Sequence, residues 1–124
     1  MFKAIEEEDC DVASVDLRMI RDDGYKIVTS DDINRGIHDS KVKIFYKDEI
    51  LKEVLLRKSF KNYVCTKMYR RQIFEKCKFK EGISYEDVLF MYEVSKIIEK
   101  IAYVNKECYI YLKRGISITA TCSE

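Results

Sequence analysis

Residues 84–104 read SYEDVLFMYEVSKIIEKIAYV and pass from a helix pattern to a strand pattern. Between Glu86 and Lys100 the main apolar residues are four, three and four positions apart, which keeps them on one face of a helix. They are Phe90, Val94, Ile97 and Ile101, and Leu89, Met91 and Ile98 widen the stripe. So wide a stripe predicts a largely buried helix. The β-rich run 101–104, which follows it, predicts a strand.

The chain on the C-terminal side of this stretch contains a second β-rich run, 108–112. Asn105 and Lys106 separate it from the first run, 101–104. Two such runs joined by a short polar segment predict a terminal hairpin.

The chain on the N-terminal side contains three further patterns. Apolar residues at helical spacing in 47–58 predict a helix, and 70–77 predict a shorter one. Residues 41–46 predict a strand. Strands and helices are therefore intermixed along this part of the chain.

The first 40 residues contain two alternating runs, 11–20 and 25–29. The segment Arg21-Asp22-Asp23-Gly24 lies between them, and an Asp-Gly pair favours a turn, so the two runs predict a β-hairpin. Residues 30–40 are polar and predict a surface loop. Together the patterns predict a mixed α/β (α+β) fold, a short mixed sheet with about three helices.

Composition limits the class of protein. The 124 residues are enough for one domain with a single core. The 23 basic side chains nearly balance the 22 acidic ones, which disfavours a dedicated nucleic-acid binder. No apolar run approaches the roughly 20 residues that cross a bilayer, and the acidic start is unlike a secretory signal. The five cysteines include no Cys-x-x-Cys pair, so we expect free thiols in a soluble, cytoplasmic protein.

The segment Ser84-Tyr85-Glu86-Asp87 at the helix start fits a capping box. In this motif Ser84 accepts a hydrogen bond from a backbone N–H and Asp87 reaches back. Acidic residues in a first turn are also favoured by the helix dipole. Capping alone can therefore explain the carboxylate pair, and Asp87→Ala would then cost about 0.5–2 kcal/mol of stability and change nothing else.

A second line of evidence is the order of four motifs within residues 62–119, about half of the chain. The motifs are Tyr63-Val64-Cys65-Thr66-Lys67-Met68-Tyr69-Arg70-Arg71, Phe79-Lys80-Glu81-Gly82, Tyr85-Glu86-Asp87-Val88-Leu89-Phe90 and Tyr109-Ile110-Tyr111-Leu112-Lys113-Arg114-Gly115-Ile116-Ser117. In this order they resemble the Lys-Leu-Tyr-Arg-Arg, Phe-x-Glu-Gly, Glu-Asp-x-x-Phe and Tyr-x-Tyr-x-x-Arg-x-x-Ser segments of family 2 glycosyltransferases. The chain thus resembles the C-terminal, acceptor-side portion of these enzymes, which have a GT-A fold.

The resemblance also implies which parts of such an enzyme to expect. Residues 1–60 loosely fit the region after the metal-binding strand, with Cys10-Asp11-Val12 where the family often has Ala-Asp-Ile-Val. We expect the N-terminal nucleotide-binding half, which ends in an Asp-x-Asp metal motif, to be absent and the isolated chain to be inactive. Ser30-Asp31-Asp32 is not that motif, because only 30 residues precede Asp31 and a nucleotide site needs more. We expect no metal ligand or cofactor in this chain, and a divalent metal, Mn or Mg, only in the complete enzyme.

By the same resemblance, Asp87 is the base that takes the proton from the acceptor hydroxyl. Glu86 beside it binds the acceptor or holds Asp87 in place. Lys67 and Arg114 are expected to meet phosphate charge, Arg114 with a bidentate fork and Lys67 as a point charge. A solvated surface cation is nevertheless the commoner fate of such residues.

The acceptor itself is expected to contact tyrosines. Tyr85, Tyr109 and Tyr111 can stack on sugar faces, although strand tyrosines are more often half-buried packing residues. Ser117 is a further substrate-binding candidate, carried over weakly. His38, the only histidine, is assigned no role.

The implied function is transfer of a sugar, with inversion, from a nucleotide-diphosphate donor to a glycan or lipid-linked acceptor in bacterial cell-surface polysaccharide synthesis. The expected partners are the nucleotide sugar and the acceptor, without nucleic acid. A peripheral position at the inner face of the membrane is compatible with this function, as is a homodimer formed through exposed sheet edges. The alternative is a non-catalytic interaction module or a decayed remnant, whose carboxylates only cap a helix.

Overall fold

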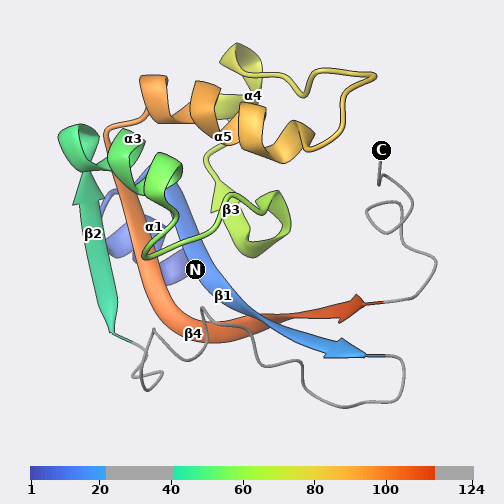
Figure 1. Ribbon diagram of the computed structural model, residues 1–124. Helices are drawn as coiled ribbons and strands as arrows, with labels where there is room; N and C mark the ends of the chain where they lie inside the picture. Colours follow the sequence, from blue (N-terminus) through green and yellow to red (C-terminus); the bar gives the residue numbers. More distant parts are fainter. Residues whose placement is uncertain (22–40, 114–124) are drawn as a thin grey trace.

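The computed structural model describes residues 1–21 and 41–113 (Figure 1). In this part of the chain a four-stranded mixed sheet has the order β2-β4-β1-β3. Strand β4 is parallel to β1, and β2 and β3 are antiparallel to their neighbours. The elements are α1 (Phe2–Glu7), β1 (Val12–Arg21), β2 (Val42–Tyr46), α3 (Lys47–Leu56), η1 (Val64–Thr66), β3 (Lys67–Tyr69), α4 (Ile73–Lys76), α5 (Glu86–Ile97) and β4 (Lys100–Lys113). The predicted mixed α/β fold class is confirmed.

The two longest helices lie close to where the patterns predict them, but α5 is not largely buried: it buries Phe90, Met91, Val94 and Ser95, whereas Ile97 of the predicted stripe is 37% exposed. Helix α3 buries Ile50 and Val54, which lie one helical turn apart. Helix α5 ends at Ile97 rather than at Lys100, because Ile98 has an extended backbone that leads into β4. No helix in the described ranges is long and apolar enough to cross a membrane.

The predicted terminal hairpin is wrong. Both of its runs belong to the single strand β4, and both pair in parallel with β1. Residues 101–104 match 12–15, and residues 109–113 match 17–21, with irregular register between the two blocks. The residues between the runs form a bulge instead of a turn, because β1 continues past them and keeps pairing with the second run.

The predicted N-terminal hairpin can be followed only in its first run. That run forms β1, whose neighbours in the described residues are β4 and β3. The second run, 25–29, and the predicted loop, 30–40, lie outside the described residues.

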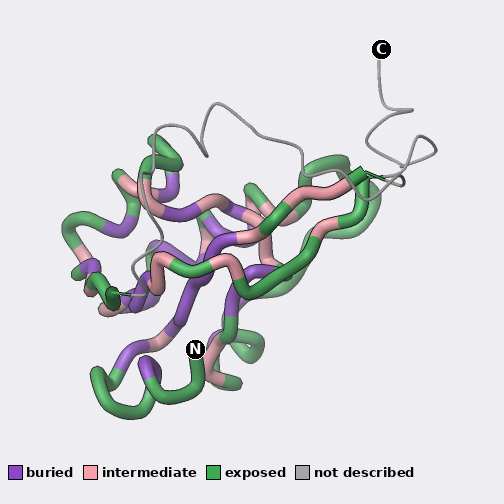
Figure 2. The backbone as a smooth tube through the Cα atoms, turned by 90° about the horizontal axis from the view of Figure 1, so that it is seen from below, coloured by how far each residue is buried: buried purple, intermediate pink, exposed green. Residues whose placement is uncertain are grey.

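The sheet is covered on both faces. Helices α3 and α5 pack over one face, and α1 packs against the other (Figures 1 and 2). Successive residues of one strand therefore point to opposite faces of the sheet. Val12 belongs to the core between the sheet and helices α3 and α5, and Ala13 belongs to the core between the sheet and α1. The larger core contains Val12, Phe45, Ile50, Val54, Phe60, Ile73, Cys77, Phe90, Met91, Val94, Ile98, Ile101 and Tyr103.

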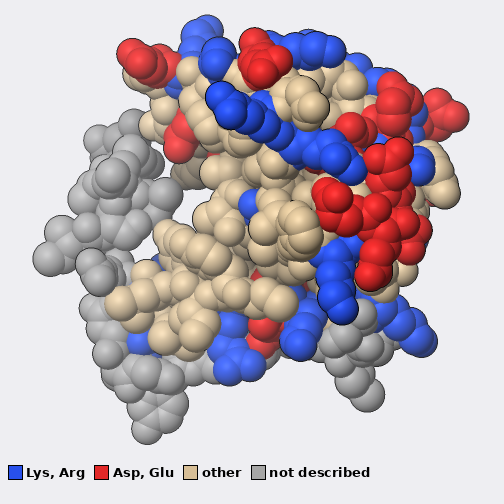
Figure 3. Space-filling view, turned by 180° about the vertical axis from the view of Figure 1, so that it is seen from behind, with Lys and Arg blue, Asp and Glu red and all other residues tan. Residues whose placement is uncertain are grey.

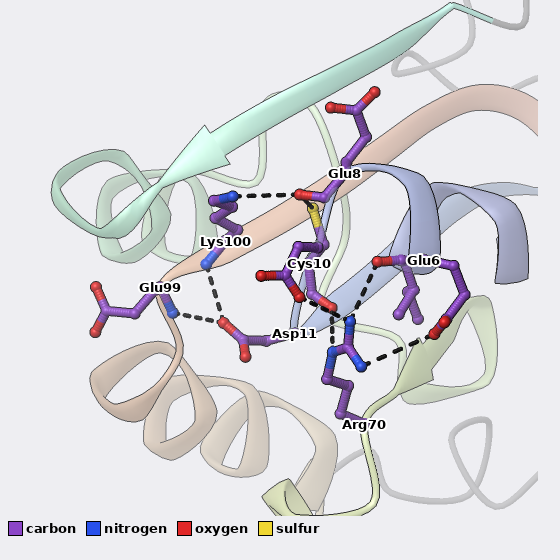
Figure 4. A network of polar contacts seen from close by, with 9 residues as sticks. Glu6, Glu8, Cys10, Asp11, Arg70, Glu99 and Lys100 are labelled. Atoms are coloured by element: carbon purple, nitrogen blue, oxygen red, sulfur yellow. Dashed lines mark hydrogen bonds and ion pairs between the residues drawn. The ribbon is translucent and has the colours of Figure 1, made fainter.

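A polar network fixes the ends of the strands near α1 (Figure 4). The Asp11 Oδ2 atom accepts hydrogen bonds from the backbone N–H groups of Glu99, at 2.7 Å, and Lys100, at 3.1 Å. Arg70, directly after β3, donates from Nε to the Cys10 carbonyl at 2.9 Å and from Nη2 to Asp9 Oδ1 at 3.0 Å. One short segment before β1 thus holds the starts of β1 and β4 and the end of β3 together.

Candidate functional site

Four segments of the chain line a cleft of about 430 Å³. The outer ends of β1 and β4 lie on the same side of the molecule as η1 and the start of α5 (Figure 1). The volume lies within the range of about 300–1,000 Å³ that is usual for small-ligand sites. The cleft is lined by Met19, Tyr63, Val64, Cys65, Tyr85, Glu86, Asp87, Tyr111 and Lys113.

Four of the predicted site residues meet in this cleft. Tyr85, Glu86 and Asp87 come from the start of α5, and Tyr111 comes from the outer part of β4. Lys67 is not among the lining residues. Arg114 and Ser117 lie outside the described residues.

The loop before α5 has local reasons for its path. The ring of Phe79 stacks on the buried ring of Phe90, with the two centroids 4.1 Å apart. Gly82 has a φ of 74°, in the left-handed region that glycine adopts without a steric penalty. Phe79 and Gly82 of the Phe-x-Glu-Gly motif therefore set the path of the loop that places Tyr85 at the cleft.

The predicted capping box at α5 is wrong. The residue that precedes the helix is Tyr85, not Ser84, and the Tyr85 side chain makes no capping hydrogen bond. Tyr85 has φ 59° and ψ 39°, a left-handed conformation that is costly for a residue with a Cβ atom. Because Tyr85 takes the cap position, Asp87 becomes the second residue of the helix and is too near its start to close the box.

The conformation of Tyr85 is unusual for its position. Asp9 and Arg57 also have positive φ angles, but both follow a helix, where a left-handed residue commonly terminates it. Tyr85 instead precedes one, and its side chain is 60% exposed in the cleft. Backbone strain of this kind is of order 1–3 kcal/mol and is found mostly where a side chain must be held for function.

The surroundings of Asp87 raise the pKa of its carboxyl group, which makes the carboxylate a better proton acceptor. Burial raises the pKa of Asp87 above its usual value, and Glu86 raises it further. The Val88 backbone amide, Lys67 and Arg57 lower the pKa but do not cancel the rise. A carboxylate with a raised pKa is a stronger base than an ordinary aspartate.

Lys67 lies behind the cleft wall. Its side chain is buried, and its Nζ atom donates to the carbonyl of Lys61, to the carbonyl of Tyr63 at 2.8 Å and to Thr66 Oγ1 at 3.4 Å. Burial lowers the pKa of Lys67 to about 7. Its predicted contact with phosphate stays a prediction, while its observed partners are protein oxygens.

Several lining residues were not singled out from the sequence. Met19 and Val64 are ordinary apolar residues whose types indicate no chemistry, and nothing around Cys65 distinguishes it from a free thiol. Tyr63 and Lys113 lie within two of the motifs, but the resemblance gives neither of them a role. Their place in the cleft depends on the β1–β4 pairing and on η1, which the sequence patterns did not predict.

Charge is unevenly spread over the molecule (Figure 3). Carboxylates gather in one part of the view, whereas another broad part of it is uncharged. Within the described ranges, no group of three or more His, Cys, Asp and Glu side chains could hold a metal ion. The cleft itself presents aromatic rings and a carboxylate pair.

The sequence was compared with protein-family models and with curated proteins. No protein-family model matches the sequence, and no curated protein matches it.

Proposed function

We propose that this chain is the acceptor-side portion of an inverting family 2 glycosyltransferase, with Asp87 as the catalytic base. The observation that carries the proposal is the cleft itself. Four residues chosen from motifs in two separate segments, Tyr85, Glu86, Asp87 and Tyr111, line one cavity. The order of motifs supports the family, and the cleft supplies a place where the acceptor binds.

The resemblance to the family implies the following reaction, in which Asp87 is the base. The acceptor hydroxyl gives its proton to the Asp87 carboxylate as its oxygen forms a bond to the anomeric carbon. The bond from that carbon to the nucleoside diphosphate breaks on the opposite face, so the configuration inverts. The raised pKa of Asp87 favours this proton transfer.

The remaining lining residues suit a saccharide. Tyr63, Tyr85 and Tyr111 present aromatic rings, which stack on the apolar faces of sugar rings. Glu86 offers oxygens that accept hydrogen bonds from sugar hydroxyls. The capping box that would explain the carboxylate pair is absent, because Tyr85 and not Ser84 precedes the helix, whereas the helix dipole still favours Glu86 and Asp87 in the first turn.

A catalytic test uses the longest in-frame protein that contains this chain. We would measure release of nucleoside diphosphate from a panel of nucleotide sugars with added saccharide acceptors. Asp87→Asn is expected to abolish release while folding persists. Asp48→Asn, in the first turn of α3, is the matched control and is expected to leave release unchanged. Full activity of Asp87→Asn would refute the role of Asp87.

A binding test uses the 124-residue chain and the Cys65 thiol, which is exposed and lines the cleft. In a background with Cys108→Ser and Cys122→Ser, mass spectrometry follows alkylation of Cys65 by iodoacetamide at rising concentrations of oligosaccharides. Acceptor-like saccharides are expected to slow alkylation. Tyr111→Ala should remove this protection, and Tyr46→Ala, at the far end of the sheet, should retain it.

A further inference from the structure

The outer half of the β1–β4 pair comprises residues 16–21 and 107–113 and extends beyond β2 and β3 (Figure 1). Tyr111 of this half lines the cleft. Successive side chains of a strand point to opposite faces of the sheet. Ile110 and Leu112 therefore lie on the face that is turned away from the cleft, which we call the reverse face.

The reverse face is apolar and exposed. Arg18 and Ile20 of β1 are the register partners of Ile110 and Leu112 and complete it. Ile110 is 64% exposed and Leu112 is 40% exposed. Helix α1 packs on the side of the sheet away from α5, but none of these four residues belongs to the core beneath it. Because parallel strands are usually covered on both faces, an exposed apolar face on this pair indicates a partner.

The exposed charged side chains around this face are all basic. They are Arg18, Arg21, Lys106, which stands in the bulge before the outer half, and Lys113. The two acidic residues of the outer half are buried instead. Asp16 is 3% exposed and accepts a hydrogen bond from the Tyr103 hydroxyl at 2.7 Å, and the Glu107 side chain is 8% exposed and pairs with Arg18. The outer half therefore presents positive charge to whatever covers it.

The α1 end of the molecule has the opposite charge. Four acidic residues in a row end α1 and follow it, and all four are exposed: Glu6, Glu7, Glu8 and Asp9. A negatively charged surface would attract the outer half and repel this end. The charge distribution thus favours one orientation of the chain on such a surface.

An anionic lipid bilayer fits the reverse face better than two other partners do. A second copy related by a two-fold axis would bring like charges together. A nucleic acid would contact the basic groups, but it would gain little from aliphatic side chains, and the four residues of this face include no aromatic ring on which a base could stack. A bilayer uses both features, because aliphatic side chains enter the interface while Lys and Arg contact lipid phosphates.

We propose that the reverse face of the outer half docks on the surface of an anionic lipid bilayer. Ile20, Ile110 and Leu112 enter the interface, and the exposed basic side chains contact the headgroups. Tyr111 belongs to the same half, so the docked chain holds its cleft close to the membrane surface. The proposal goes beyond the proposed function and does not depend on it, because lipid binding needs neither a donor sugar nor a catalytic base.

The first experiment measures binding of the 124-residue chain to vesicles by co-sedimentation. One set of vesicles contains phosphatidylcholine with phosphatidylglycerol, and the other contains phosphatidylcholine alone. We expect the chain to bind the anionic vesicles more tightly and added salt to weaken this binding. Equal binding to both sets, or binding to neither, would overturn the proposal.

The apolar contribution is tested with two equally exposed positions. Ile110→Ala is expected to lower the partition coefficient on anionic vesicles about tenfold, because it removes methyl and methylene groups that enter the interface. Leu55→Ala is the matched control, since Leu55 on α3 is also 64% exposed but lies away from the reverse face, and it should leave binding unchanged. Equal losses for the two variants would contradict the assigned face.

The charge contribution is tested with a second pair, which also decides the matter if Ile110→Ala does not fold. Lys106→Gln is expected to lower the partition coefficient about fivefold. Lys52→Gln, at an exposed position of α3, should not lower it. Equal effects of the two changes would show that no particular face docks.

Two further outcomes separate this proposal from its rivals. Self-association in sedimentation velocity that Ile110→Ala abolishes, without vesicle binding, would assign the reverse face to a second copy and refute lipid docking. Vesicle binding without transferase activity would support docking and count against the proposed function, and transferase activity without vesicle binding would do the reverse.

Discussion

The inner and outer halves of the β1–β4 pair belong to the same two strands but have opposite surroundings. The inner half, residues 12–15 with 101–104, is flanked by β3 on one side and β2 on the other. In the described part of the chain no strand flanks the outer half, residues 16–21 with 107–113. Burial follows this difference: the inner half is mostly buried and most of the outer half is half-buried or exposed (Figure 2).

Within one pair of strands, the inner half contributes residues to the core and the outer half contributes residues to the cleft. The inner half supplies Val12 and Ile101 to the larger core. The outer half supplies Met19, Tyr111 and Lys113 to the cleft. The bulge between the halves changes the direction of β4, so that a strand that begins in the core ends at the cleft.

The sharpest test of this division compares two isoleucines of β4. Ile101 is fully buried in the inner half, and Ile110 is 64% exposed in the outer half. Ile101→Ala is expected to lower the free energy of unfolding by about 2–5 kcal/mol, because it removes methylenes and leaves a cavity. Ile110→Ala is expected to change it by less than about 0.5 kcal/mol. Urea unfolding measures both free energies, and similar losses at the two positions would contradict the difference between the inner and outer halves.

A second test concerns the anchor at the inner end. Asp11→Ala removes a charged acceptor from two backbone N–H groups at the start of β4. We expect a loss of about 1–3 kcal/mol in the free energy of unfolding. Glu99→Gln, which removes only an exposed ion pair with Lys47, should cost less than about 1 kcal/mol and serves as the control. A loss for Asp11→Ala no larger than the control would show that the inner half needs no such anchor.

A third test examines the strain opposite the outer half. Tyr85 has a left-handed backbone and an exposed side chain. Asn tolerates this conformation better than other residues with a Cβ atom, so Tyr85→Asn should be more stable than Tyr85→Ala by about 1 kcal/mol. Thermal unfolding of the two variants measures the difference. In both variants, saccharides should no longer slow the alkylation of Cys65. If they still do, Tyr85 is not part of the acceptor site.

The smallest expected effect on stability is that of Asp87→Asn. Because the pKa of Asp87 is raised, the folded chain binds its proton more tightly than the unfolded chain. The stabilisation from this proton is present below the usual aspartate pKa and is lost as the pH rises through the raised one. At pH 7 Asp87→Asn should therefore be as stable as the unmodified chain or slightly more so. A loss of about 0.5–2 kcal/mol in urea unfolding would restore the capping role.

Much of the fold could be predicted from periodicity alone. Helices α3 and α5 have apolar stripes that recur at helical spacing, and the strand at 42–46 is β-rich. The missed elements α1, η1 and β3 have three to six residues each, too few for a period to show. The terminal hairpin was wrong because Asn105 and Lys106 suggest a turn locally, while the pairing of β4 with the distant β1 decides the outcome.

The site was predictable where a motif contained chemical groups. Tyr85, Glu86, Asp87 and Tyr111 were chosen from the sequence, and the structure brings them together. Burial is what the motif could not reveal for Lys67, because a lysine before a tyrosine and two arginines suggests an exposed cation. The carboxylate pair also had two explanations in the sequence, and only the backbone of Tyr85 shows that Ser84 is not the cap residue.

The parallel pairing of β1 with β4 also governs when the chain can fold. Val12 pairs with Ile101, so β1 is synthesised before β4 and must wait for it. Contacts so distant in sequence slow folding and leave β1 without its central partner during synthesis. We expect ribosome-bound chains arrested before Lys100 to be digested by protease and chains extended beyond Lys113 to resist. Resistance in the shorter chains would instead place the folding nucleus in α3 and α5.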